Sequence, residues 1–191
     1  MPRLFLIDSF GYIFRAYYAR MRMNAPPMRT SAGVATEAVY IFHNMLKKLR
    51  EKHQPDYLAA VYESLGPTFR ETEFPAYKAN RTETPPDLIA QVPLVKRLLE
   101  ALSIPVIEAA GFEADDVIGT LSKRAQANGL EVVIVSSDKD MLQLVGPGVS
   151  MLNPAKDDTL YDRELVKEFM GVWPEQVADL LALKGDAVDN L

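Results

Sequence analysis

The sequence contains no cysteine and only two histidines among its 191 residues. Without cysteine there can be no disulfide, no thiolate nucleophile and no zinc-thiolate centre. His43 and His53 fall in or just after one predicted helix, which argues against a zinc hydrolase site built from several histidines. Zinc hydrolase chemistry of that kind is therefore not expected.

Long hydrophobic runs are missing as well. The apolar run at residues 4–7 is interrupted by Asp8, far short of a signal-peptide core or of the ~20 residues that span a membrane. The chain is nevertheless 48% hydrophobic, which is enough to bury a core. We therefore expect a soluble, cytoplasmic, monomeric protein without a membrane partner, in which residues 1–191 form one domain.

The net charge of -5 hides an asymmetry along the chain. Residues 1–81 carry 12 Lys and Arg against 7 Asp and Glu, a balance of +5, whereas residues 82–191 carry 9 against 19, a balance of -10. A basic part facing an acidic part suits a protein that holds polyanion phosphates on one side and hard cations on the other. A surface charge that is uneven for no functional reason would give the same charge balance in the two parts of the chain.

Apolar runs that end in an acid alternate with amphipathic stretches. The runs at 3–8, 57–63 and 131–140 are typical of strands buried on both faces of a parallel sheet. Further short strands are expected at 105–107, 149–152 and 159–161. Helices are expected after a cap at Ser9 and over 34–52, 85–102, 114–128, 162–171 and 174–185. This order predicts a three-layer α/β fold with a mainly parallel central sheet and helices on both faces.

Residues 64–86 have no apolar periodicity, but they contain Arg70, Tyr77, Lys78 and Arg81 among other aromatic residues and prolines. About 20 residues without regular structure inside a compact domain usually form a functional lid or a mobile segment. The basic and aromatic composition suits stacking on bases and clamping of phosphates. A poorly ordered surface excursion is the alternative.

Three carboxylates, Glu113, Asp115 and Asp116, stand at the start of the helix predicted over 114–128. One or two acids there would be ordinary partners of the helix dipole. Three within four positions repel one another, since unit charges ~4 Å apart interact by about 4 kcal/mol at an effective dielectric constant of 20. The pattern thus indicates either a helix cap or a cation site.

The carboxyl ends of parallel strands share one edge of the sheet, where ligands bind. If the acidic helix and the end of the chain reach that edge, nine carboxylates meet there: Asp8, Glu63, Glu113, Asp115, Asp116, Asp138, Asp140, Asp186 and Asp189. Carboxylate oxygens without histidine or cysteine favour Mg²⁺ or Mn²⁺ over zinc. Two such ions ~3.5–4 Å apart would clamp an in-line displacement at phosphorus, so the pattern predicts phosphodiester hydrolysis.

The chain also resembles the 5′-nuclease domain found at the N-terminus of bacterial DNA polymerase I and in related flap endonucleases and 5′-3′ exonucleases of the PIN-like superfamily. The stretches that carry the resemblance follow the family order and cover nearly the whole chain: 6–8, 14–17, 69–70, 77–81, 111–116, 137–140, 185–186 and 189–190. The resemblance implies a 5′-nuclease fold, two Mg²⁺ ions for which Mn²⁺ can substitute, and 5′-3′ exonuclease and flap endonuclease activity in replication and repair.

The resemblance also implies roles for single residues. Asp8, Glu63, Glu113, Asp115 and Asp116 would surround the first metal ion, and Asp138, Asp140, Asp186 and Asp189 the second, directly or through water. Lys78 and Arg81, on the arch-like segment 64–86, would be catalytic and contact the scissile phosphate. Asp116 would be catalytic as a ligand of the first metal ion. Arg15 and Arg70 would bind substrate, and Tyr77 would stack on a base. The substrates implied are DNA with a 5′ flap, a nick or a free 5′ end, and RNA–DNA hybrids, at the bacterial nucleoid and beside a polymerase domain of a longer chain.

Two departures from the family pattern keep alternatives open. Glu63 stands where the family usually has Asp, and the chain ends at residue 191, before the expected duplex-binding helical hairpin. The extra methylene of Glu63 moves its carboxylate by roughly one carbon–carbon bond and could reshape the first metal site. A PIN-like ribonuclease, or a truncated domain that binds metal and nucleic acid with little or no turnover, are the alternatives.

Overall fold

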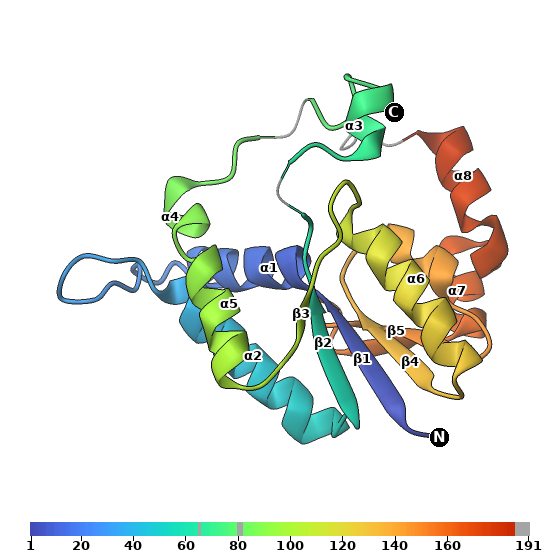
Figure 1. Ribbon diagram of the computed structural model, residues 1–191, viewed down its shortest axis with the longest axis horizontal. Helices are drawn as coiled ribbons and strands as arrows, with labels where there is room; N and C mark the ends of the chain where they lie inside the picture. Colours follow the sequence, from blue (N-terminus) through green and yellow to red (C-terminus); the bar gives the residue numbers. More distant parts are fainter. Residues whose placement is uncertain (65, 80–81, 186–191) are drawn as a thin grey trace.

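The computed structural model describes residues 1–64, 66–79 and 82–185 (Figure 1). Its six-stranded sheet has the order β3-β2-β1-β4-β5-β6. The strands are β1 (Arg3–Asp8), β2 (Tyr57–Val61), β3 (Val106–Ile107), β4 (Glu131–Val135), β5 (Val149–Asn153) and β6 (Thr159–Tyr161). Neighbours pair in parallel except β5 and β6, which are antiparallel. The mainly parallel sheet predicted from the sequence is therefore confirmed.

Helices cover both faces of the sheet, which makes three layers (Figure 1). One face carries α1 (Ser9–Arg22), α2 (Glu37–His53) and α5 (Val92–Ala101), and the other carries α6 (Ala114–Ala127), α7 (Arg163–Met170), α8 (Val177–Lys184) and the 3₁₀ helices η1 (Lys139–Leu144) and η2 (Pro174–Gln176). Within the described ranges, no helix combines the length and apolar character needed to cross a bilayer.

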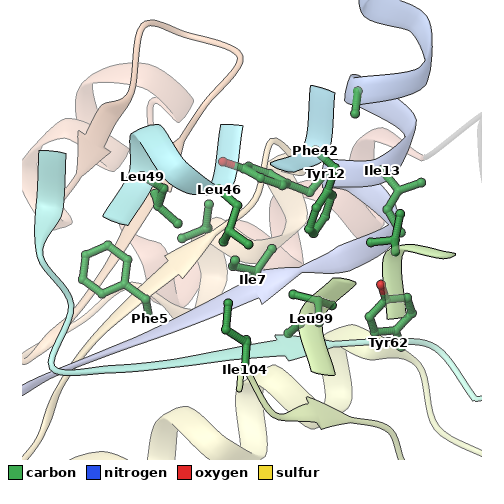
Figure 2. Close-up of a cluster of buried hydrophobic side chains, with 14 of the residues drawn as sticks. Phe5, Ile7, Tyr12, Ile13, Phe42, Leu46, Leu49, Tyr62, Leu99 and Ile104 are labelled. Carbon is green, nitrogen blue, oxygen red and sulfur yellow. The ribbon is translucent and has the colours of Figure 1, made fainter. Parts of the chain in front are cut away.

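The alternation of side chains along β1 explains the two cores. Phe5 and Ile7 pack against α1, α2 and α5 in the cluster that Figure 2 shows, whereas Leu6 packs in a second cluster with α6. Successive side chains of a strand point to opposite faces, so a strand that is apolar at every position is buried on both sides. The central strand thus holds both helical layers to one sheet.

The helix expected over 85–102 is in fact two, α4 (Pro86–Ile89) and α5, separated at residues 90–91. Pro93 explains the break, because proline has no N–H to bond the carbonyl four residues back and its ring clashes with that carbonyl. The fully buried side chain of Gln91, freed by the break, accepts hydrogen bonds from the amides of Ala38 at 2.8 Å and Val39 at 3.4 Å. It thereby caps the N-terminus of α2, which begins at Glu37 rather than near residue 34.

Two other local expectations were wrong. Asp8, not Ser9, caps α1, because the Asp8 Oδ1 accepts a hydrogen bond from the Gly11 amide at 3.2 Å and Ser9 is the first helical residue. The segment 64–86 is not devoid of regular structure, since α3 (Phe69–Glu73) forms within it. A reciprocal capping box between Thr68 and Glu71 supplies the local signal that starts this short helix.

Candidate active site at the carboxyl edge of the sheet

A cleft of about 1010 Å³ lies beyond the carboxyl ends of β1, β2 and β4. Its lining includes seven of the nine predicted carboxylates: Asp8, Glu63, Glu113, Asp115, Asp116, Asp138 and Asp140. Asp186 and Asp189, and likewise Arg81, lie outside the described residues. Four separate segments of the chain thus deliver acids to one place, as expected for a sheet whose parallel strands end at a common edge.

Asp8 is held between two neighbouring strand ends. Its Oδ2 accepts a hydrogen bond from the buried Ser136 hydroxyl at 2.8 Å, and that hydroxyl oxygen accepts one from the Asp138 amide at 3.1 Å. A Cβ at Gly11 would lie 2.6 Å from the Asp8 Oδ2, so glycine is required beside this carboxylate. Ser136 and Gly11 were not identified from the sequence, although Ser136 directly follows the apolar run of β4.

Asp115 lies where negative charge accumulates. Burial raises the pKa of Asp115 to about 7, and the neighbouring carboxylates of Asp8, Asp138 and Glu113 contribute to that rise, against the opposing effect of Lys78. Burial also raises the pKa of Asp8, and the Asp138 carboxylate adds to that shift. Carboxyl groups whose pKa is raised by burial and by neighbouring carboxylates indicate a site that favours bound positive charge.

Two cations from the segment 66–79 lie against the acidic helix terminus. Arg70 forms a bidentate pair with Asp116, with Nη1–Oδ2 at 2.7 Å and Nη2–Oδ1 at 2.8 Å. This guanidinium holds the pKa of Asp116 below its usual value, and the Asp116 carboxylate in turn raises the pKa of Arg70. Figure 1 shows α3, which carries Arg70, beyond the carboxyl edge of the sheet.

Lys78 and Tyr77 contact the same terminus. Lys78 Nζ lies 2.7 Å from the Glu113 Oε1 and 4.0 Å from the Glu63 Oε1, and the Tyr77 hydroxyl donates to the Glu113 Oε2 at 3.2 Å. The backbone of Lys78 has a φ of 56°, in the left-handed region that long side chains rarely adopt. The segment predicted to form an arch therefore covers the cleft with its basic side chains directed at the carboxylates.

The chemistry of the donor set fits a hard divalent cation. Every predicted ligand is a carboxylate, and the pKa of Asp115 is raised first by burial and then by the neighbouring carboxylates of Asp8, Asp138 and Glu113. Within residues 1–64, 66–79 and 82–185, however, no three such side chains are already gathered around one point as a metal site. Two of the acids, Glu113 and Asp116, bind Lys78 and Arg70 instead.

The cleft extends beyond the predicted residues along α6. Gly119, Thr120 and Lys123 line it from this helix, and Gln143 and Leu144 line it from η1. Positions 116, 119, 120 and 123 share one helical face, so the period of the helix would have identified this wall from the sequence. Arg15, which was predicted to bind substrate, is on α1 and does not belong to the described lining of the cleft.

A family model described as 5′-3′ exonuclease, N-terminal resolvase-like domain, matches residues 3–171. DNA polymerase I of Treponema pallidum (strain Nichols) is 44% identical over 190 residues, which are 98% of this chain and 19% of that polymerase. The 5′-3′ exonuclease of Aquifex aeolicus (strain VF5) is 39% identical over 191 residues, which are 100% of this chain and 64% of that protein. The chain thus spans less than two thirds of the length of these relatives.

Solved structures share the fold at low sequence identity. A complex of the bacteriophage T5 flap endonuclease with DNA and metal ions has a TM-score of 0.73 at 21% identity, covering 98% of this chain and 68% of that one. Flap endonuclease-1 from Methanococcus jannaschii has a TM-score of 0.59 at 17% identity, covering 97% of this chain and 65% of that one. These likenesses confirm the fold class predicted from the sequence.

Proposed function

The chain belongs to the family described as 5′-3′ exonuclease, N-terminal resolvase-like domain, and from this premise we propose that it is a divalent-metal-dependent 5′-3′ exonuclease and 5′-flap endonuclease. The observation that supports this most directly is the cleft in which seven carboxylates from distant segments meet two cations of the overlying segment. Such a cleft suits hydrolysis of a phosphodiester, because it combines ligands for hard cations with groups that bind a phosphate.

Two Mg²⁺ ions, or Mn²⁺ in their place, fit the carboxylates by chemistry. We assign Asp8, Glu63, Glu113, Asp115 and Asp116 to the first ion and Asp138, Asp140, Asp186 and Asp189 to the second. When bound, such ions neutralise charge on the reacting phosphate and make a water molecule more acidic. The hydrogen bonds of Ser136 to Asp8 and Asp138 would orient ligands of both groups, as partners behind metal ligands do elsewhere.

The basic side chains of the segment 66–79 are proposed to bind the phosphate of the substrate. Arg70 and Lys78 would exchange their carboxylate partners for substrate phosphate, with Arg81 beside them, and hold the scissile bond over the acids. Tyr77 would stack on the base next to the cut. Both Arg70 and Lys78 are anchored near the N-terminus of α6, which places the proposed phosphate contact at the same end of the helix as Asp115 and Asp116.

The proposed substrates are DNA with a 5′ flap, a nick or a free 5′ end, and RNA in RNA–DNA hybrids. Support comes from the bacterial relatives named DNA polymerase I and 5′-3′ exonuclease, and from the phage flap endonuclease captured with DNA and metal ions. By the same reasoning the chain would act as a monomeric unit in the bacterial cytoplasm, next to a polymerase domain when it is part of a longer protein.

The test is cleavage of a 5′-flap DNA with Mg²⁺ or Mn²⁺ by the wild type and by Asp116→Ala. We expect kcat to fall at least about 100-fold in the variant, because an acid assigned to the first metal ion is lost. Glu100→Ala, which removes an exposed acid on α5 away from the cleft, is the control and should keep full activity. Circular dichroism of each variant verifies the fold.

Two results would reject the proposal. The first is a wild-type protein that cleaves no 5′-flapped, nicked or single-stranded DNA in the presence of either metal ion. The second is a strong preference for an RNA flap of the same sequence over the DNA flap, which would support the PIN-like ribonuclease instead. Cleavage that is unchanged in Asp116→Ala would leave a nuclease but refute the assigned role of this carboxylate.

A further inference from the structure

Lys123 differs from the other basic residues that line the cleft. Arg70 and Lys78 both come from the segment 66–79 and both pair with carboxylates at the start of α6. Lys123 comes from α6 itself and is exposed. Among the described lysine and arginine residues that line the cleft, Arg70 and Lys78 form ion pairs and Lys123 does not.

The position of Lys123 follows from helix geometry. It lies seven residues after Asp116 on the same face of α6, which corresponds to ~10 Å along the helix axis. This is about three steps of a B-form strand, which rises ~3.4 Å per nucleotide. A phosphate bound by Lys123 would therefore lie within about three nucleotides of one bound beside Asp116.

Beside Lys123, the arm of the cleft between α6 and η1 is lined by the uncharged Gly119, Thr120, Gln143 and Leu144. A Cβ at Gly119 would lie 3.4 Å from the Leu144 Cδ2, so α6 and η1 pack closely here because position 119 is glycine. The Thr120 hydroxyl donates to the Asp116 carbonyl at 2.8 Å, and the Gln143 amide donates to the Asp140 carbonyl at 3.0 Å. Lys123 thus supplies a positive charge among these uncharged groups, seven residues along α6 from the carboxylate of Asp116.

The charges of the residues that line the cleft favour one path for a bound nucleic acid strand. The carboxylates repel phosphates that are not compensated by bound cations, so a strand leaving the reacting position is favoured where the wall is neutral or basic. We propose that Lys123 binds a backbone phosphate of the cleaved strand, within about three nucleotides of the scissile bond, on the arm of the cleft between α6 and η1. The proposal rests on the proposed nuclease function and adds a substrate-binding residue to it.

The first experiment compares Lys123→Ala with Arg124→Ala in 5′-flap cleavage with Mg²⁺. Arg124 is the matched control, because it is the next residue of α6, is exposed, carries the same charge and does not line the cleft. We expect Lys123→Ala to raise KM about 3- to 10-fold with kcat within about 2-fold of wild type. Lys123→Arg should restore KM, and Arg124→Ala should leave both constants unchanged.

Salt dependence separates a phosphate contact from a structural effect. Between about 50 and 200 mM KCl, the slope of log KM against log salt should become shallower by about 0.7 to 0.9 in Lys123→Ala, as expected when one phosphate contact is lost. A set of flaps with one neutral methylphosphonate linkage each, placed within four nucleotides of the cut, locates the contact. At one position, the neutral linkage should raise the KM of the wild type and leave the KM of Lys123→Ala unchanged.

The outcomes distinguish this proposal from the function on which it rests. If the wild type cleaves DNA but Lys123→Ala and Arg124→Ala have the same KM and salt slope, the inference about Lys123 is overturned and the nuclease assignment stands. If the wild type does not cleave, the nuclease assignment fails, and fluorescence anisotropy with the same flap DNA still tests the contact. Equal affinity of the two alanine variants in that assay, or no DNA binding by the wild type, would refute it.

Discussion

Asp115 lies in the cleft in surroundings that disfavour its ionised form. Its carboxyl group is largely buried and faces the carboxylates of Asp8, Asp138 and Glu113. Burial and repulsion both favour the neutral acid, and they raise the pKa of Asp115 to about 7. Without a bound cation, ionisation of this residue at neutral pH works against the folded state.

The stability of the metal-free protein should therefore fall as the pH rises. The pKa of Asp115 is raised on folding from 3.8 to about 7, so the folded state binds more protons than the unfolded state between those values. In EDTA, Asp115→Asn should reduce the loss of unfolding free energy between about pH 5 and pH 7.5 by about 1 to 2 kcal/mol. Urea unfolding at both pH values measures this difference.

The control for this prediction is Asp179→Asn, which alters an exposed aspartate on α8 outside the described lining of the cleft. It should follow the wild-type pH dependence, since it leaves Asp115 and the carboxylates around it in place. An Asp115→Asn protein that loses as much stability as the wild type over this pH range would contradict the assignment of the raised pKa.

At the scale of elements, α2 depends on a side chain from another segment for its N-terminal cap. Thr36, at the N-cap position, makes no side-chain capping bond, and the Gln91 Oε1 accepts from the amides of Ala38 and Val39 instead. The same side chain donates to the Asp87 carbonyl of α4 at 3.0 Å. Gln91 thereby joins α2 to the break between α4 and α5, and fixes the helical layer on that face of the sheet.

Replacing this cap with a side chain of similar length should destabilise the whole protein. Gln91→Met leaves the buried amide of Ala38 without its acceptor, and we expect a loss of about 1 to 3 kcal/mol in unfolding free energy. Chemical denaturation measures it. Gln143→Met, at an exposed glutamine of η1, is the control and should change stability by less than about 0.5 kcal/mol. Equal stability of the two variants would show that the Gln91 cap does not stabilise the fold.

In the arch-like segment, interactions between neighbouring residues start the helix α3, and interactions with distant residues position the segment. The capping box of Thr68 and Glu71 is local and starts α3. The orientation of that helix depends instead on Arg70 and Asp116, which are 46 residues apart, and on Lys78 and Glu113, which are 35 apart. Charge-assisted pairs of this kind, one of them bidentate, fix geometry as well as adding energy.

For the molecule as a whole, the two charge-biased parts of the chain meet at the cleft. Arg70 and Lys78 belong to the basic part, residues 1–81, and they pair with Asp116 and Glu113 of the acidic part. These pairs compensate two carboxylates, while Asp8, Asp115 and Asp138 still repel one another. A cation that binds these acids only in the folded state would stabilise the whole structure.

Mg²⁺ should accordingly raise the melting temperature at about pH 7.5. At a hundredfold excess over Kd, binding adds about 2.7 kcal/mol, which for a chain of this size corresponds to about 5 to 10 °C. Differential scanning fluorimetry with and without EDTA measures the shift, and Asp8→Asn should reduce it. An equal rise with NaCl at matched ionic strength would indicate screening of charge rather than binding.

The strands that end in acids, and their place at one edge of a parallel sheet, follow from the sequence alone. Apolar runs, helical periodicity and capping residues are properties of neighbouring positions, so the pattern of residues placed Asp8 and Asp138 at a common edge, and Asp115 with them on the condition that its helix reaches that edge. It also indicated that Arg70 and Lys78 lie in a basic segment beyond the second strand.

Only the tertiary structure decided which side chains meet. The hydroxyl of Ser136 reaches Asp8 across 128 positions of the chain, Gln91 caps a helix 53 positions away, and Lys123 shares a wall with η1. The physical reason is that these contacts depend on how strands and helices pack against one another and on how closely α6 approaches η1 at Gly119. None of these effects can be read from the periodicity of a single element.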